Sequence, residues 1–336
     1  MTDKNVDNLL VNKPDNILEI KDLYVTYRTD EALIYAVNGL NLAVQKGQTL
    51  GLVGETGAGK TTTALSVMRL LPNKIGQITQ GEILLDGKAV LQLTDGDMRI
   101  LRGDTVSMIF QDPMTSLNPV LPVGKQIREA LRLHPNNRSK QEIEDRVDTI
   151  LDMVGISPDR KNEYPHQFSG GMKQRVVIAI ALACQPKLLL ADEPTTALDV
   201  TIQAQVLQMM TELKEELNTA MVLITHDLGV VAEICDNVAI MYAGEIIENG
   251  TVEDIFENEN HHPYTNGLFG SIPDLTRTTK RLSPIPGLMP DPAIQHEGCP
   301  FTPRCPNRLE ICQKEKPPLF VHGTHSIKCH LFAPEE

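Results

Sequence analysis

The alternation of apolar and polar positions predicts strands in the first part of the chain. Residues 17–27, ILEIKDLYVTY, alternate with the two-residue period of a strand. Residues 81–90, GEILLDGKAV, predict a hairpin strand with Asp86-Gly87 as the turn signal. Residues 40–71 predict a strand, a glycine turn, a second strand, a glycine-rich loop and a helix in succession. Residues 1–16 show no such period, and we expect them to form a loose tail.

Helical and strand patterns alternate through the middle of the chain. Residues 123–160 carry apolar residues at helical spacing, and a further helix is expected after the sequence FSGG, which ends at residue 171. The sequence KLLLADE then predicts a strand, residues 199–217 a helix, and AMVLITHD another strand. Strands that alternate with helices in this way favour an α/β fold built on a parallel sheet.

The amino-acid composition changes after residue 256. Seven of the 22 prolines fall between Pro284 and Pro306, which excludes long helices there. We therefore expect a flexible tail at 1–16, an α/β domain at 17–255, and a separate, irregular C-terminal extension at 256–336.

Composition and charge exclude some classes of protein. The chain has 336 residues, of which 41% are apolar and none is Trp, so it can build a large aliphatic core. Its formal net charge of −13 argues against a protein that coats nucleic-acid phosphates, because such proteins show a basic surface. The longest apolar run, 176–184, is shorter than the roughly 18 residues that span a bilayer. The N-terminus lacks the pattern of a secretory signal, so we expect a cytosolic chain with reduced cysteines.

The sequence GETGAGKT matches the phosphate-loop pattern G-x-x-x-x-G-K-[ST], and it follows the apolar strand TLGLV and opens a helix. Its glycines let backbone N–H groups turn toward phosphate oxygens, and the helix N-terminus adds positive charge. We expect Lys60 to reach the β- and γ-phosphates of a nucleotide and Thr61 to bind Mg²⁺. The nucleotide-binding residues predicted here are Gly54, Glu55, Thr56, Gly57, Ala58, Gly59, Lys60, Thr61 and Thr62.

Two adjacent carboxylates end the apolar run LLLADE. A charge at the end of a buried strand needs a partner, and beside a phosphate loop Asp192 is expected to face the magnesium ion of the nucleotide. Glu193, one residue further on, would orient or deprotonate the attacking water. The alternative is a solvated strand end with no such role.

The sequence FSGGMKQR, residues 168–175, predicts a second phosphate site. Ser169 can cap the following helix, and Gly170 and Gly171 leave its N-terminus open to an anion. One phosphate loop and a second phosphate site in one chain suggest that the second site serves a partner's nucleotide. At this point residues 17–255 clearly resemble the ATP-binding subunits of ABC transporters, whose signature motif is L/F-S-G-G.

The resemblance implies a fold and further site residues. The fold is the P-loop NTPase fold of ABC ATPases: a RecA-like parallel sheet, an antiparallel β subdomain and a helical signature subdomain. Tyr27 matches the aromatic residue that stacks on adenine, although Tyr24 and Tyr35 are nearby alternatives. The remaining matches are Gln111 in IFQDP, which senses Mg²⁺ and the membrane partner, Asp199 in TTALD, and His226 in LITHD, which touches the γ-phosphate.

The resemblance also implies a mechanism. Two ATP-binding subunits sandwich two ATP molecules head to tail, each between one subunit's phosphate loop and the other's signature helix. Closure acts on the membrane subunits near Gln111, and hydrolysis, with Glu193 as base and His226 at the transition state, reopens the dimer.

Four of the six cysteines cluster in the C-terminal extension. Cys184 and Cys235 lie in apolar helical surroundings and are assigned to packing. Thiols grouped in a proline-rich segment of a reduced protein suggest a metal site. The spacings x5, x6 and x16 do not fit a C-x2-C zinc ribbon, and zinc, an iron–sulfur cluster and unliganded thiols all remain open. The four residues are Cys299, Cys305, Cys312 and Cys329.

The extension resembles that of the oligopeptide/dipeptide (peptide/nickel) importer ATPases. The resemblance lies in HHPYTNGLFGSIPDL, IPGLMPDP and GCPFTPRCP, together with MIFQDPMTSLNPV in the ATPase region. It implies a 4Fe–4S cluster on the four clustered cysteines, in a structural role, although His325 or His330 could substitute as a ligand.

The function implied is that of an ATPase subunit of a bacterial peptide importer, bound peripherally at the cytoplasmic face of the membrane. Its partners would be a second, similar ATPase in a heterodimer, two membrane permeases and an extracytoplasmic peptide-binding protein, with no nucleic acid. The same group includes importers of nickel and other small solutes. A soluble ABC ATPase for DNA repair or ribosomes, or a module that uses ATP only as a structural ligand, are alternatives from other classes. The acidic balance, the single cassette and the presence of Glu193 and His226 speak against them.

Overall fold

The computed structural model describes residues 15–134, 139–196, 198–271 and 284–333. The chain forms two compact units, the first from residues 1–43, 50–84 and 225–336, the second from residues 44–49 and 85–224. Almost all of the tail expected at 1–16 lies outside the described residues. No helix within the described ranges is long and apolar enough to cross a membrane.

The first unit contains an antiparallel sheet of three long strands. These are β1 (Asn16–Arg28), β2 (Leu33–Gln45) and β4 (Gly76–Leu85), in the order β2-β1-β4. In β1 the residues alternate between buried and more exposed positions, as predicted for 17–27. A turn at Asp86 and Gly87, both with positive φ, follows β4 and leads to β5 (Lys88–Ala89), so the predicted turn is confirmed.

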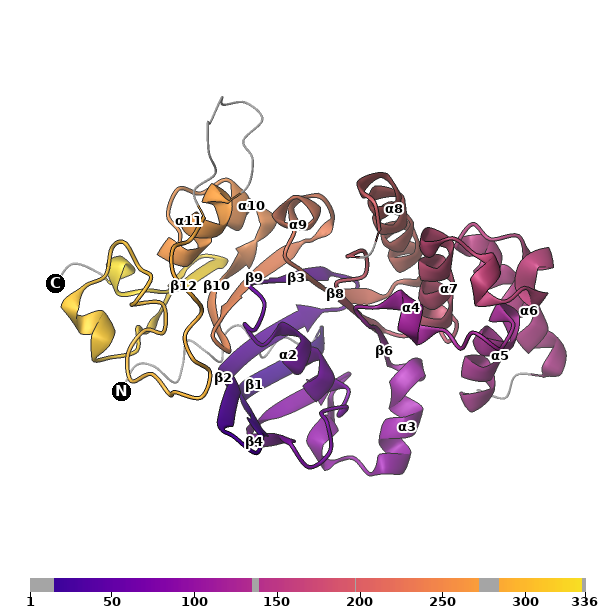
Figure 1. The fold of residues 1–336 in the computed structure, drawn as a ribbon, viewed down its shortest axis with the longest axis horizontal. Coiled ribbons are helices and arrows are strands. Elements are labelled where there is room, and N and C mark those ends of the chain that lie inside the picture. The colour runs from indigo at the N-terminus through magenta and orange to yellow at the C-terminus, as the bar shows by residue number, and fades with distance from the viewer. Residues whose placement is uncertain (1–14, 135–138, 197, 272–283, 334–336) are drawn as a thin grey trace. The chain divides into compact units, whose positions relative to one another are not determined.

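The first unit also holds a mixed sheet in the order β11-β12-β10-β9-β3. Its strands are β3 (Thr49–Val53), β9 (Asn237–Tyr242), β10 (Glu245–Thr251), β11 (Leu319–His322) and β12 (His325–Lys328). β3 runs parallel to β9. The other three neighbouring pairs, β9–β10, β10–β12 and β12–β11, are antiparallel. Figure 1 shows β12, in yellow, beside β10, in orange. The extension after residue 256 therefore adds a hairpin to this sheet, which its irregular sequence did not predict.

Aromatic residues from the extension share a core with the sheet of the first unit. Tyr242 at the end of β9 packs against Tyr264 and Phe301, with ring centroids 4.6 and 5.2 Å apart, and all three side chains are buried. Such burial of large rings supplies much of the apolar contact that holds an otherwise irregular segment in place. The helices of this unit are α2 (Lys60–Val67), α9 (Leu228–Ile234), α10 (Val252–Phe256) and α11 (Pro263–Gly270).

The second unit is a parallel sheet with helices. Its strands β6 (Val106–Ile109), β7 (Leu188–Asp192) and β8 (Ala220–Thr225) lie in the order β8-β7-β6, and both neighbouring pairs are parallel. β7 and β8 are buried along their whole length, which explains their continuous apolar sequences. The strands predicted from KLLLADE and AMVLITHD are thereby confirmed, and the helix predicted at 199–217 is present as α8 (Val200–Leu217).

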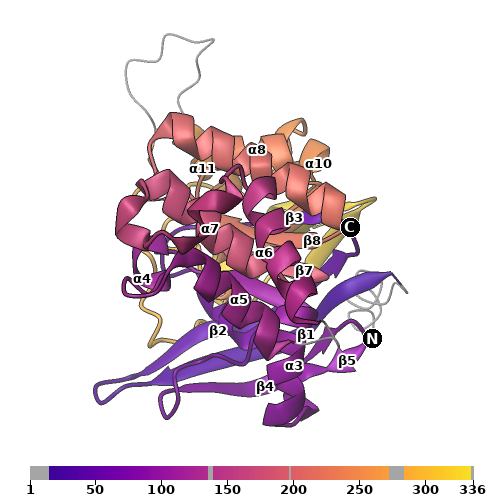
Figure 2. The same ribbon diagram turned by 90° about the vertical axis from the view of Figure 1, so that its right-hand side faces the viewer.

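The helices of the second unit follow the predicted pattern. Figure 2 shows α5, α6 and α7 side by side. The helix expected after FSGG is present as α7, but it begins at Gly170, directly after Ser169 and so within the motif, and its middle is buried. The helices in the described part of this unit are α3 (Asp95–Asp104), α4 (Pro113–Ser116), α5 (Val123–Leu133), α6 (Lys140–Met153), α7 (Gly170–Leu182) and α8 (Val200–Leu217).

Candidate nucleotide and cysteine sites

The phosphate loop lies between β3 and α2 in the first unit. Gly59 precedes the helix with φ +107°, a conformation that an L side chain rarely adopts, and an added Cβ would lie 2.5 Å from Ala36 O. The Lys60 side chain is buried, and its ammonium donates to Gly54 O at 2.6 Å and to Glu55 O at 3.0 Å. The lysine charge is thus held over the loop, where phosphate oxygens would be bound.

Tyr27 lies beside the start of α2. Its hydroxyl donates a hydrogen bond to Thr62 Oγ1 at 3.2 Å, so the ring lies close to the residue that follows the Lys-Thr pair of the loop. Tyr24 and Tyr35 instead line a cavity of about 470 Å³ together with Gly57. All three tyrosines therefore lie near the loop, and adenine stacking by Tyr27 stays a prediction.

The acids predicted for catalysis end the strand β7 in the second unit. Asp192 is 3% exposed, and Glu193 follows with φ +46°, an unusual conformation for a residue with a side chain. Such backbone strain costs on the order of 1 kcal/mol and occurs often at functional sites. The Glu193 carboxylate accepts hydrogen bonds from Gln111 Nε2 at 3.0 Å and from Thr196 Oγ1 at 2.9 Å. The structure thus brings together Gln111 and Glu193, which are 82 positions apart.

The signature motif lies at the N-terminus of α7 in the same unit. Ser169 is the N-cap, and its hydroxyl accepts a hydrogen bond from Met172 N at 3.4 Å. Gly171 packs closely on α8, since an added Cβ would lie 2.5 Å from Ile202 Cγ2, whereas a Cβ on Gly170 would make only an ordinary contact, 3.9 Å from Leu198 Cδ2. Asp199 caps α8 and accepts from Ile202 N at 3.1 Å. Ile202 therefore links the signature motif to the helix that Asp199 begins.

His226 follows β8 and is exposed. It belongs to the first unit with the phosphate loop, whereas Asp192, Glu193 and Gln111 belong to the second. The magnesium ligand set of Thr61, Gln111 and Asp192 is divided between the units in the same way, so its assembly stays a prediction.

The four clustered cysteines line one small cavity in the first unit, with His262 and His330 among the other lining residues. None of them forms a disulfide. Cys299 N donates to Cys312 O at 2.8 Å, which ties the two thiol-bearing turns together. Burial raises the pKa of Cys299 and of Cys329 to about 11, so both are neutral thiols without a bound cation. The sequence spacing alone did not show that the four thiols converge.

The two histidines that could substitute for a cysteine are placed differently. His330 lines the cysteine cavity, and its Nε2 lies 3.1 Å from Glu315 O. His325 instead places Nε2 2.8 Å from Glu248 Oε1. Of the two, His330 is the one positioned for a role beside the thiols.

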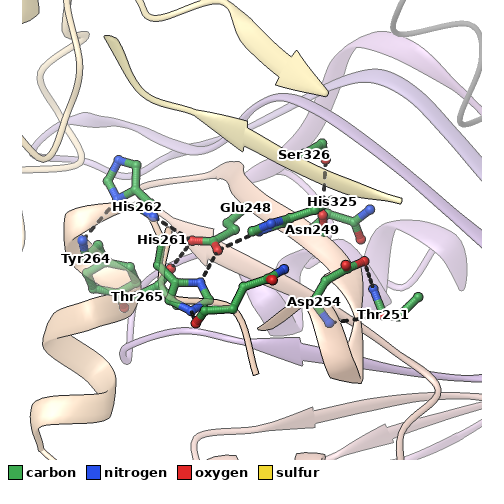
Figure 3. A network of polar contacts seen from close by, with 11 residues as sticks. Glu248, Asn249, Thr251, Asp254, His261, His262, Tyr264, Thr265, His325 and Ser326 are labelled. Carbon is green, nitrogen blue, oxygen red and sulfur yellow. Dashed lines mark hydrogen bonds and ion pairs between the residues drawn. The ribbon is translucent and has the colours of Figure 1, made fainter. Parts of the chain in front are cut away.

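Glu248, a residue not singled out by the sequence, is the centre of a buried polar network (Figure 3). Its Oε1 lies 2.7 Å from His261 Nδ1 and 2.8 Å from His325 Nε2, and its Oε2 accepts from His262 N at 2.9 Å and Thr265 Oγ1 at 2.5 Å. Burial by itself raises the pKa of Glu248, but the hydrogen bonds from His261, His325 and Thr265 outweigh it and lower the pKa to about 2. The network joins β10, the α11 segment and β12, and nothing in the local sequence around Glu248, EIIENG, indicated it.

His261 in this network is best described as a buried cation. Its Nδ1 faces the Glu248 carboxylate at 2.7 Å and its Nε2 faces Asn258 O at 2.7 Å, so both nitrogens must donate a proton. Burial lowers the pKa of His261, but the hydrogen bond and charge of Glu248 outweigh this and raise it above 6.5. The ligand atoms of Glu248, His261 and His325 lie within 4.8 Å of one another, yet His261 has no lone pair left for a metal. Hydrogen bonding, and not metal binding, explains this cluster.

Comparison with known protein families identifies two regions of the chain. A model described as "ABC transporter" matches residues 37–196, and one described as "Oligopeptide/dipeptide transporter, C-terminal region" matches residues 247–312.

Curated relatives match the chain over nearly its whole length. The dipeptide transport ATP-binding protein DppD of Bacillus subtilis is 47% identical over 321 residues, covering 94% of this chain and 95% of the relative. The oligopeptide transport ATP-binding protein OppD of Salmonella typhimurium is 48% identical over 327 residues, covering 96% of each.

Solved structures share the fold. The dimeric post-hydrolysis state of the ATP-binding cassette MJ0796, bound to ADP and Pi, matches with a TM-score of 0.62 and 29% identity over 70% of this chain and 98% of that one. The structure of cbiO1 from Clostridium perfringens, part of the ABC transporter complex cbiONQ, matches with a TM-score of 0.63 and 29% identity over 73% of this chain and 92% of that one.

Proposed function

The chain belongs to the ATP-binding proteins of ABC transporters, and we propose that it powers the uptake of peptides through a membrane importer. It has the P-loop ABC ATPase fold, and ATP with Mg²⁺ fits its phosphate loop, in which Lys60 is held over the loop carbonyls. Hydrolysis of ATP coupled to transport is the activity of this family.

The hydrogen bond between Gln111 and Glu193 is the observation that supports hydrolysis most directly. It holds one carboxylate oxygen of Glu193 at the end of β7, where a general base is needed. We assign Glu193 the role of orienting or deprotonating the attacking water, Gln111 that of sensing Mg²⁺ and the membrane partner, and His226 that of a contact to the γ-phosphate. Asp192 and Thr61 would complete the magnesium site, and Tyr27 would stack on adenine.

Two subunits would act together. The signature residues Ser169, Gly170, Gly171 and Asp199 would contact the nucleotide of a partner. In support of this, α7 begins with two glycines, so no side chain covers the backbone N–H groups there. The dimeric state of the cassette MJ0796 with ADP and Pi is a precedent for such pairing in a relative. The partner proposed here is a second, similar ATPase, and the two would dock on a pair of permeases that receive peptide from a binding protein. The chain would then lie at the cytoplasmic face of the membrane.

Similarity to named peptide transport proteins supports peptide as the cargo. The dipeptide and oligopeptide transport proteins match this chain over at least 94% of its length, and the C-terminal region model also matches. Nickel or another small solute is the alternative within the same group. We also propose that the chain is organised as an ATPase domain at 17–255 and a C-terminal extension at 256–336.

Uptake measurements separate these cargoes. Cells that lack the chain should lose uptake of a radiolabelled peptide and keep that of nickel, and wild-type protein, but not Glu193→Gln, should restore it. Loss of nickel uptake alone would contradict the peptide assignment. Affinity purification from detergent-solubilised membranes should recover integral membrane proteins, and a preparation with ribosomes and no membrane protein would contradict the transporter assignment.

We also propose that Cys299, Cys305, Cys312 and Cys329 bind a 4Fe–4S cluster. The fit rests on the donor set, four thiols lining one cavity. Four thiolates suit either zinc or an iron–sulfur cluster, and we choose the cluster because the extension resembles that of the oligopeptide/dipeptide importer ATPases. When bound, the cluster would staple a segment that has little apolar core of its own.

Metal analysis tests the cluster. Protein purified without oxygen should contain iron and acid-labile sulfide in equal amounts, and the Cys305→Ser variant should lose both. Stoichiometric zinc in place of iron would contradict the cluster and leave the ATPase assignment intact.

A further inference from the structure

An ion pair joins the C-terminal segment to the phosphate loop. Arg304 Nη1 donates to Glu55 Oε2 at 2.6 Å and Arg304 Nη2 donates to Glu55 Oε1 at 3.0 Å, across 249 positions of sequence. The Arg304 side chain is only 4% exposed. Two parallel charge-assisted hydrogen bonds fix both the place and the plane of the carboxylate. Glu55 is the second residue of the loop GETGAGKT, so its side chain is set by a residue far outside the loop.

The backbone of Glu55 is held as well. Its N–H donates to the Tyr264 hydroxyl at 2.9 Å, and Tyr264 is fully buried. Its carbonyl accepts from Lys60 Nζ at 3.0 Å. The side chain, the N–H and the carbonyl of Glu55 therefore all take part in hydrogen bonds, and the carbonyl is one of the two that position the phosphate-binding lysine.

Arg304 is itself fixed by its surroundings. Its Nε donates to Pro286 O at 3.1 Å, and its guanidinium lies 5.9 Å from the ring centroids of Tyr242 and Phe301. The hydrogen bonds from Arg304 to Glu55 raise the pKa of the arginine, which stays cationic at any working pH. Its backbone N–H donates to Phe301 O at 2.9 Å, within the turn that also carries Cys299 and Cys305. These contacts fix the guanidinium of Arg304 in one position, in which it faces the phosphate loop.

The rest of the loop has little freedom near Glu55. An added Cβ on Gly54 would lie 2.2 Å from Met241 O, and Ala58 O accepts from Gly244 N at 2.8 Å. The end of β9 and the turn after it thus constrain Gly54 and Ala58, and the C-terminal segment holds Glu55 between them. A carboxylate in a loop that binds a polyanion also repels the ligand unless a cation neutralises it.

We propose that Arg304, assisted by Tyr264, is a positioning residue of the nucleotide site. Its cation neutralises Glu55 and keeps the peptide groups at Glu55 oriented, so that Lys60 stays directed at the phosphates. The C-terminal segment would thereby set the nucleotide affinity of the ATPase without touching the nucleotide. The inference rests on nucleotide binding by the phosphate loop.

Nucleotide affinity of the full-length protein tests the inference without the need for turnover. The dissociation constant of a fluorescent ADP analogue should rise about tenfold or more in Arg304→Met, because a bidentate charged contact is lost. Arg304→Lys keeps the charge but not the paired hydrogen bonds, so its dissociation constant should lie between those of wild type and Arg304→Met. Tyr264→Phe, nearly the same shape, should weaken binding by about threefold through loss of one hydrogen bond. Arg308→Met, an exposed arginine four positions on, is the matched control and should bind as wild type.

A double variant separates positioning from loss of folding. If Arg304 acts through Glu55, then Glu55→Gln with Arg304→Met should bind nucleotide more tightly than Arg304→Met alone, because no unpaired carboxylate remains. Effects that add, or an unchanged affinity in Arg304→Met, would overturn the inference. If wild-type protein itself fails to bind nucleotide, the ATPase function fails instead, so the two failures are distinguishable.

Discussion

Gln111 and Glu193 are joined by a hydrogen bond from Nε2 to Oε2 at 3.0 Å, at the end of β7. Glu193 reaches this place with a left-handed backbone, φ +46°, and its N–H donates to Ile224 O at 2.9 Å. The side chain that is proposed as general base is therefore positioned by its own backbone and by a residue on a different segment. This arrangement leads to the first prediction.

Glu193→Gln should lower ATP turnover by about 10²–10⁴-fold, the usual contribution of a general base. The amide keeps the shape of the side chain but cannot accept a proton. ATP should remain bound, so size-exclusion chromatography with ATP should show a persistent dimer with the partner ATPase. Glu215→Gln, an exposed position on α8, is the control and should hydrolyse ATP at the wild-type rate. Undiminished turnover in Glu193→Gln would remove Glu193 from this role.

Two neighbouring glycines in the signature motif should respond differently to alanine. At Gly171 an added Cβ would lie 2.5 Å from Ile202 Cγ2, so Gly171→Ala should destabilise the protein by about 1–3 kcal/mol. At Gly170 the nearest atom, Leu198 Cδ2, is 3.9 Å away, so Gly170→Ala should keep wild-type stability.

Gly170→Ala, which should keep wild-type stability, should nevertheless lose ATPase activity. The methyl of Gly170→Ala would occupy the surface that is proposed to receive a partner's nucleotide, and misplacement there should cost ATPase activity about a hundredfold. Thermal unfolding and ATPase assays of both variants make the comparison. A stable, fully active Gly170→Ala protein would be incompatible with the signature role.

Glu248→Gln should strongly destabilise the first unit. The change removes the negative partner of the His261 cation while both stay buried, and breaking such a pair costs about 3–5 kcal/mol. Urea unfolding at pH 7 measures the loss. Glu253→Gln, an exposed glutamate close in sequence, is the control and should stay within about 0.5 kcal/mol of wild type. Equal stability of the two variants would show that the network is not needed for folding.

His262 should make the protein less stable in mild acid. Burial lowers the pKa of His262 from 6.5 to about 4, only partly opposed by the charge of Glu248. The unfolded chain therefore takes up a proton below pH 6.5 that the folded chain takes up only near pH 4, so stability falls as the pH decreases through this window. The loss should be on the order of 2 kcal/mol between pH 7 and pH 5.

The His262→Asn variant isolates this effect. Asn can still accept the hydrogen bond that His262 Nδ1 accepts from Tyr264 N at 3.0 Å, as the N-cap of α11. It cannot titrate, so urea midpoints measured from pH 7 to pH 5 should fall less steeply than in wild type. Parallel slopes for the two proteins would assign the acid sensitivity to other groups.

The sequence predicted most elements of the second unit and the motifs they carry. Ser169 and the glycines after it predict the start of α7, and the apolar run before Asp192 predicts β7. Helix capping and strand burial each depend on neighbouring residues, so both can be recognised in the local sequence. The hairpin β11–β12 was not predicted, since its two strands have only four residues each and lie in a polar, proline-rich region. The choice among Tyr24, Tyr27 and Tyr35 as the adenine-stacking residue stays a prediction, because all three lie near the phosphate loop.

The amino-acid sequence by itself determined the family, the phosphate loop, the acids at the end of β7 and the signature helix, because each is encoded by neighbours within one short segment. Only the tertiary structure decided that Glu248 joins two histidines and that Arg304 reaches Glu55. These pairs lie 13, 77 and 249 positions apart, and no local pattern specifies them. They form because the folded chain buries polar groups, and burial makes each one find a partner of opposite charge or hydrogen-bonding sense.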